Sequence, residues 1–236
     1  MNERITSVQN PLIKHIVKLQ NDRVYRNEKQ QVVIEGRKMV AEAKNLQQVF
    51  TTDEKDSFGK NTTLVSPEVM KKMSFVKSPE GIVAIVTMPS YTTLESVSKI
   101  LVLDGIQDPG NLGTLLRSAL AFGWEGVYLL DNCCDPYNDK ALRGAKGATF
   151  RLKLYRGDAQ HLKALTEFHQ VLIADLEGQT PESLSQVDKR VLVLGSESQG
   201  VSEKIRGMGE RVTLPISKDM ESLNVAVAGG ILMYLL

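Results

Sequence analysis

The sequence predicts an α/β protein in which a domain with a parallel sheet follows a smaller α/β domain. Continuous apolar runs alternate with helix-forming stretches along the chain, and this alternation is typical of a parallel sheet covered by helices on both faces. The charge balance also changes along the chain. Residues 1–93 carry 14 Lys and Arg against 10 Asp and Glu, whereas residues 94–236 carry 15 against 18. We therefore expect two domains, 1–93 and 94–236.

Composition narrows the class of protein. The chain has 236 residues, 42% of them hydrophobic and 24% charged, with a net charge of +1, which suits a globular fold and excludes collagen, a disordered chain and a disulfide scaffold. The N-terminus lacks the pattern of a secretory signal. The longest apolar stretch, 223–236, is shorter than the roughly 20 residues needed to cross a bilayer. We expect a cytoplasmic protein with no membrane crossing.

The first domain is expected to begin with a helix after Asn10-Pro11, where apolar residues recur at helical spacing. The pattern then predicts strands at 31–36, 47–52, 63–66 and 81–88, and helices at 37–46 and 67–75. The excess of Lys and Arg in this part favours contact with a polyanion, although solvated helix faces would give the same composition.

The second domain repeats the alternation with stronger apolar strands. Strands are predicted at 100–106, 126–132, 151–155, 170–176, 190–196 and 211–216, and helices at 111–123, 140–148, 158–169, 202–208 and 222–236. The last helix is apolar nearly all round and contains Gly229-Gly230. It must therefore be buried on more than one side, and a second subunit is one candidate for its partner.

Ligands of such sheets bind beyond the carboxyl ends of the strands, and three polar segments follow strands directly. In the first, 104–117, Asn111 is either the N-cap of the next helix or a functional side chain, and Arg117 projects from the margin of an apolar stripe. In the second, 195–200, two glycines surround Glu197. This segment is either a ligand-binding turn or a plain surface turn. In the third, 214–224, Ser222 could simply cap the last helix.

Other kinds of active site are not indicated. The segment at 104–117 lacks the G-x-G-x-x-G fingerprint, and the chain has no P-loop and no serine-hydrolase elbow. The three histidines show no metal-ligand spacing, so no metal site is predicted. Cys133 and Cys134 are adjacent, with no basic neighbour that would activate a thiol, and packing roles are favoured for both.

The three segments together resemble the three motifs of the SpoU (TrmH) family of S-adenosylmethionine-dependent RNA 2′-O-ribose methyltransferases. The motifs read Asn111-x-Gly-x-x-x-Arg117, then Leu-Gly-Ser-Glu197-x-x-Gly, then Leu-Pro-Ile followed by Ser222-Leu-Asn224-Val-x-Val-Ala. The opening ITSVQNPLIKHIVKL and VVIEGRKMVAEA are similar to the family's ribosomal-protein-like substrate-binding domain. The resemblance therefore spans essentially the whole chain.

The resemblance implies more than the residue pattern does. It implies that the second domain is an α/β-knot (SPOUT) domain with a deep trefoil knot, that the cofactor is S-adenosylmethionine, and that the enzyme is a homodimer with RNA as its substrate. It favours ribosomal RNA over transfer RNA. The implied catalytic residues are Asn111, Arg117, Glu197, Ser222 and Asn224. The implied cofactor-binding residues are Leu194, Gly195, Gly200, Ile216 and Leu223.

In the family, the residue matched by Arg117 is assigned as the general base, although an arginine side chain gives up its proton only above about pH 12. An RNA phosphate that takes up the proton while Arg117 orients both groups would resolve this difficulty. The sequence departs from the family at Ser196 and Ser198, where Asn and Gly are usual. The stretch 143–147 is a further candidate for phosphate contact.

Two other functions fit the same scaffold. One is an RNA-binding protein that has lost turnover, which the presence of Asn111, Arg117, Glu197 and Asn224 disfavours. The other is a Rossmann-type methyltransferase of small molecules, whose glycine-rich turn should follow the first strand rather than late strands.

Overall fold

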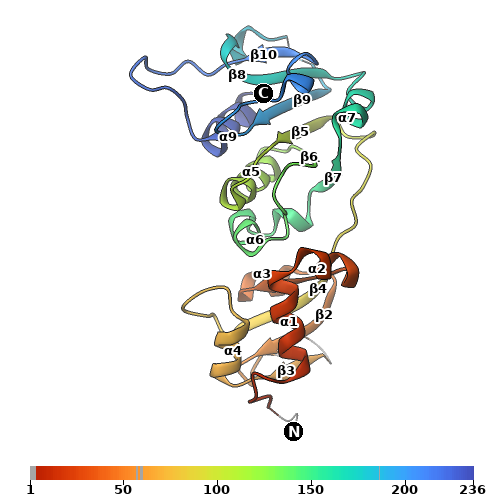
Figure 1. Cartoon of the computed structure of the whole chain (residues 1–236), viewed down its shortest axis with the longest axis vertical. Helices are drawn as coiled ribbons and strands as arrows, with labels where there is room; N and C mark the ends of the chain where they lie inside the picture. The colour runs from red at the N-terminus through yellow and green to blue at the C-terminus, as the bar shows by residue number, and fades with distance from the viewer. Residues whose placement is uncertain (1–3, 57, 59–60, 186) are drawn as a thin grey trace. The chain divides into compact units, whose positions relative to one another are not determined.

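The computed structural model describes residues 4–56, 58, 61–185 and 187–236. Two compact units divide the chain (Figure 1). The first comprises Met1–Pro89 and Tyr137–Asp139, and the second comprises Ser90–Pro136 and Lys140–Leu236.

The first unit is built on a four-stranded sheet of order β1-β4-β2-β3. Strand β4 pairs antiparallel with both β1 and β2, and β3 runs parallel to β2. The strands are β1 (Gln31–Glu35), β2 (Leu46–Thr51), β3 (Thr62–Leu64) and β4 (Ile82–Thr87), and the helices are α1 (Pro11–Asn21), α2 (Arg23–Lys29), α3 (Arg37–Glu42) and α4 (Pro67–Met73).

The first helix begins where the sequence predicts it. The Asn10 side chain accepts a hydrogen bond from the backbone N–H of Leu12, 2.9 Å away, and Pro11 occupies the first helical position. Helix α2 was not predicted, because its residues show no apolar periodicity. It forms because Asp22 ends α1 and caps α2 by accepting from the N–H of Tyr25.

The second unit holds a six-stranded, all-parallel sheet of order β10-β8-β9-β5-β6-β7. Its strands are β5 (Lys99–Asp104), β6 (Gly126–Leu130), β7 (Lys153–Gly157), β8 (Gln170–Gln179), β9 (Arg190–Gly195) and β10 (Glu210–Val212). Its α-helices are α5 (Pro109–Ala121), α6 (Asp139–Ala145), α7 (Ala159–Leu165), α8 (Glu203–Arg206) and α9 (Val225–Leu235), with short 3-10 helices at Ala148–Phe150 and Pro181–Ser183.

Both faces of this sheet are buried, as the apolar strands predict. Along β5, Leu101 and Leu103 belong to the core that includes α5 and α9, whereas Ile100 and Val102 belong to a second core on the opposite face. Alternate side chains of a strand point to opposite faces. The predicted parallel α/β fold with a preceding α/β domain is confirmed.

Helix α9 lies close against β9 and α5. A Cβ atom on Gly229 would come within 2.4 Å of the Leu194 side chain and 2.6 Å of the Leu115 side chain, so only glycine fits this contact. Among the described residues, no helix is long and apolar enough to cross a membrane.

Two predictions near the third segment were wrong. Strand β10 ends at Val212 rather than at residue 216, because β8, the strand with which it pairs, itself ends at Gln179 opposite Val212. Ser222 does not cap the last helix. Asn224 does, since its side chain accepts from the backbone N–H groups of Ala226 and Val227 at 3.0 and 3.3 Å.

Candidate active site

The strands β5 and β9 bring the first two predicted segments to the same edge of the sheet. They are neighbouring parallel strands, and Asp104 at the end of β5 lies opposite Gly195 at the end of β9. The chain segments that follow them therefore emerge side by side.

Helix α5 starts at Pro109 rather than at Asn111, and its N-cap is Asp108. The Asp108 carboxylate accepts from the backbone N–H of Asn111 at 2.9 Å, and Pro109 takes the first helical position. The Lys140 ammonium lies 2.5 Å from the same carboxylate and holds the pKa of Asp108 below its usual range. The reading of Asn111 as the N-cap was thus wrong, and its side chain is free for other contacts.

The side chain of Asn111 joins all three segments. Its Nδ2 donates to the Glu197 carboxylate, and its Oδ1 accepts from Asn224 Nδ2 at 3.2 Å. The orientation of each amide follows from the cap of α9. Because Asn224 uses its oxygen to cap that helix, it can offer only its NH₂ group to Asn111, which in turn presents NH₂ to Glu197.

Glu197 sits in a tight turn that two glycines allow. Ser196 and Gly200 exchange backbone hydrogen bonds of 3.1 and 2.9 Å across the turn. Gly200 has φ of +66°, and a Cβ atom on Gly195 would lie 2.0 Å from the carbonyl carbon of Gly200. Such a close backbone approach requires glycine at position 195.

The contacts do not link the remaining predicted site residues to Asn111. Arg117 is exposed on α5, six residues beyond Asn111, with no hydrogen-bond or ion-pair partner in the described part of the chain. Ser222 and Leu223 are exposed and Ile216 is half-buried, all in the irregular segment before α9. The Leu194 side chain is buried in the core, so only its backbone could face a ligand.

Sequence reasoning missed the cap at Asp108, although an Asp-Pro pair ahead of a helix is a recognised start signal. It also missed the polar contacts of Asp104, a single acid at the end of an apolar strand.

The two cysteines have the properties of packing residues. Burial raises the pKa of the Cys133 thiol, and it raises that of Cys134 to about 11, which disfavours the reactive thiolate. Across the residues that the structure describes, no group of three or more His, Cys, Asp or Glu could hold a metal ion.

Comparison with known proteins identifies the family. Residues 98–234 match the SpoU rRNA Methylase family, and residues 10–84 match the MRM3-like substrate binding domain. The chain is 34% identical to an uncharacterized tRNA/rRNA methyltransferase of Synechocystis, over 98% of this chain and 92% of that protein. It is 30% identical to the 23S rRNA (guanosine(2553)-2′-O)-methyltransferase RlmP of Bacillus subtilis, over 98% of each.

The fold is also that of a solved methyltransferase. An AdoMet-bound rRNA methyltransferase from Sinorhizobium meliloti superposes with a TM-score of 0.88 at 24% identity, over 99% of this chain and 96% of that one. The expected resemblance, activity class and cofactor are confirmed: this chain belongs to the SpoU rRNA methylase family of S-adenosylmethionine-dependent RNA methyltransferases.

Proposed function

We propose that this protein transfers a methyl group from S-adenosylmethionine to a ribose 2′-hydroxyl of ribosomal RNA. The observation that carries the proposal is the Asn111 side chain, which binds both Glu197 and Asn224 and so holds three distant segments in one site. The similarity to RlmP, named for 2′-O-methylation of 23S rRNA, supports ribosomal RNA as the substrate.

The chain offers suitable backbone groups for the cofactor. In the described residues, the backbone N–H groups of Ile216, Ser222 and Leu223 have no hydrogen-bond partner, nor has that of Glu197. Free donors beside apolar side chains suit an adenosine, which needs both polar contacts at its edges and an apolar face. We assign cofactor binding to the backbone at Leu194, Gly195, Gly200, Ile216 and Leu223. Of these, Ile216 and Leu223 offer free N–H donors, whereas the N–H of Gly200 is already bonded to Ser196. When bound, the cofactor supplies a methyl group on a sulfonium.

We assign the handling of the 2′-hydroxyl to Arg117, which is exposed and has no hydrogen-bond or ion-pair partner among the described residues. A free guanidinium can hold a hydroxyl and a phosphate oxygen together with parallel N–H donors. In this proposal Arg117 orients both, and the phosphate takes up the hydroxyl proton. The sulfonium would supply the methyl group to the ribose oxygen and leave as a neutral thioether. Asn111, Glu197, Ser222 and Asn224 form the polar surroundings, in which Glu197 fixes neighbouring donors and the ribose is held for in-line attack.

Replacing Arg117 with Lys should lower kcat on ribosomal RNA by about 100-fold, because a single ammonium cannot reproduce two parallel donors. The affinity for S-adenosylmethionine should stay unchanged by calorimetry. Arg151→Lys makes the same exchange at another exposed arginine of the second unit and should keep full activity. Normal turnover of Arg117→Lys would contradict the role assigned to Arg117.

We also assign RNA binding to the first domain, residues 1–93, and specifically to the exposed surface of α1 and α2. Lys14 and Lys18 lie four residues apart on α1, a helix without acidic residues, so they share one face. The ammonium groups of Lys18 and Lys29 both lie over the Tyr25 ring, 4.2 and 5.5 Å from its centroid, and that of Lys29 is paired with Glu28 at 3.0 Å. Within the described residues, Lys14 and Lys18 have no ion-pair partner. Uncompensated positive charge of this kind attracts phosphates.

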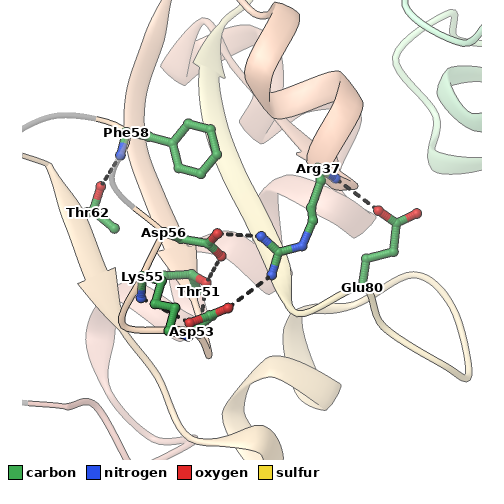
Figure 2. A network of polar contacts seen from close by, with 8 residues as sticks. All are labelled: Arg37, Thr51, Asp53, Lys55, Asp56, Phe58, Thr62 and Glu80. Carbon is green, nitrogen blue, oxygen red and sulfur yellow. Dashed lines mark hydrogen bonds and ion pairs between the residues drawn. The ribbon is translucent and has the colours of Figure 1, made fainter.

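Arg37, the first residue of α3, is exposed like Lys14 and Lys18 but has ion-pair partners. Figure 2 shows the Arg37 guanidinium directed at Asp53 and Asp56, while its backbone N–H donates to Glu80 at 3.0 Å. Burial tends to raise the pKa of Asp56, but hydrogen bonds from Thr51 and Arg37 outweigh it and keep that pKa below its usual range. The charge of Arg37 is therefore neutralised within the domain, which makes this arginine a poor candidate for phosphate contact.

The double variant Lys14→Gln/Lys18→Gln should bind ribosomal RNA more than about tenfold more weakly. The slope of log affinity against log salt should fall by about 2, one for each lost phosphate contact. Fluorescence anisotropy with labelled rRNA at several salt concentrations measures both quantities. Arg37→Gln is the matched control and should leave the slope unchanged. An unaltered slope in the double variant would place the RNA elsewhere.

The outer side of α9 supports the implied homodimer. Val227, Ile231 and Tyr234 form a stripe at helical spacing, with exposed fractions of 51%, 40% and 72%. Phe122 extends it, with its ring 5.5 Å from that of Tyr234. We assign this stripe to a second copy of the chain. The cytoplasmic location and the trefoil knot stay predictions.

Sedimentation equilibrium should give a dimer for the wild-type protein at micromolar concentration and a monomer for Ile231→Glu, because dimerisation would bury an unpaired charge. Phe168→Glu introduces the same charge at another exposed apolar residue of this unit, 79% exposed in the turn that follows α7, and should remain dimeric. A monomeric wild-type protein would refute the assignment.

A further inference from the structure

Asp104 has a buried carboxylate and contacts both ends of the turn 195–200, which contains Glu197. Asp104 is only 3% exposed and ends the central strand β5. Its backbone lies opposite Gly195, where the turn begins. Its side chain accepts a hydrogen bond of 2.8 Å from the backbone N–H of Ser202, just beyond the turn. Asp104 therefore holds the start of the turn by strand pairing with Gly195, and it holds the end of the turn by the hydrogen bond from Ser202 to its carboxylate.

The second carboxylate oxygen is used by another loop. Asp104 Oδ1 accepts from Asn132 Nδ2 at 3.1 Å, and Asn132 Oδ1 accepts from the backbone N–H of Gly105 at 3.0 Å. Gly105 has φ of +73°, which turns the chain away from the strand. The ends of β5, β6 and β9 are thus tied together at one buried acid.

The contacts explain why the residue is an acid and not an amide. Both neighbours of Asp104, the Ser202 N–H and the Asn132 NH₂ group, are donors. An ionised carboxylate accepts from both. An asparagine at position 104 would place its NH₂ group against one of these donors, and that hydrogen bond could not form. A buried donor left without an acceptor is costly.

We propose that Asp104 is a positioning residue for the methyl-transfer site, acting through the turn that presents Glu197 to Asn111. Asp104 itself touches neither RNA nor cofactor in this account. The inference rests on the proposed function for its catalytic consequence. Its structural consequence, a turn that loosens without this carboxylate, can be judged separately.

The test compares Asp104→Asn, Glu197→Gln and the double variant with the wild-type protein. Asp104→Asn should speed amide hydrogen exchange in 196–202 by at least about tenfold, the effect of losing a hydrogen bond to a charged acceptor. It should also raise the Kd for S-adenosylmethionine and lower kcat on ribosomal RNA, each by a factor similar to the change in exchange rate. In the Glu197→Gln background, the same change should cause no further loss of kcat, because Asp104 acts through Glu197.

Asp158→Asn is the matched control. The Asp158 carboxylate also accepts a backbone N–H, that of His161 at 2.8 Å, but at the cap of α7. It should leave exchange in 196–202, cofactor affinity and kcat unchanged.

Asn132→Ala provides a second variant if Asp104→Asn does not fold. It removes one of the two side-chain contacts of Asp104 and keeps the contact to Ser202, so it should shift the same quantities in the same direction by less.

Unchanged exchange in 196–202, or losses of kcat that multiply in the double variant, would overturn the inference. A wild-type protein that fails to methylate ribosomal RNA would instead refute the proposed function, and the exchange and cofactor-binding results would still decide the role of Asp104.

Discussion

The site depends on one side-chain amide that joins residues far apart in the chain. Asn111 contacts Glu197, 86 residues later, and Asn224, 113 residues later. The contact with Asn224 uses the Asn111 side-chain oxygen, the atom that an N-cap residue turns to its own helix, so the arrangement depends in turn on Asp108 taking the capping role. The cap of α9 uses the side-chain oxygen of Asn224, so Asn224 donates to Asn111 and Asn111 donates to Glu197. The geometry of the site therefore depends on which residues cap α5 and α9.

The parallel sheet explains why these segments meet at all. Carboxyl ends of parallel strands lie at one edge, and the register of β5 with β9 places Asp104 opposite Gly195 there. The glycine contacts at Gly195 and Gly229 let backbone and helix approach more closely than any side chain would allow. Packing of α9 on β9 then delivers Asn224 to the same edge. In our proposal the second unit carries the catalytic residues, and the first carries the lysines assigned to RNA binding.

Much of the fold could be predicted because short, β-branched apolar runs such as ILVLD and RVLVLG, alternating with helix-forming stretches, are typical of buried parallel strands. The motif residues could be named from their family resemblance, but their contacts could not. Sequence alone left Asn111 with two readings, since asparagine is both a good N-cap and a good amide donor. It offered Ser222, and not Asn224, as a possible cap of the last helix. It also extended β10 too far, because a strand ends where its neighbour stops pairing, which the local pattern does not record. Asp104 gave no signal, as its role comes from loops 28 and 98 residues away.

The central claim is that three segments form a single S-adenosylmethionine site connected through Asn111. Nuclear magnetic resonance of the ¹⁵N-labelled protein during titration with the cofactor tests it most directly. The account predicts that the side-chain amides of Asn111 and Asn224 and the backbone amides of 195–200 shift together, with one common saturation curve. Shifts confined to one segment, or segments that saturate at different cofactor concentrations, would contradict it.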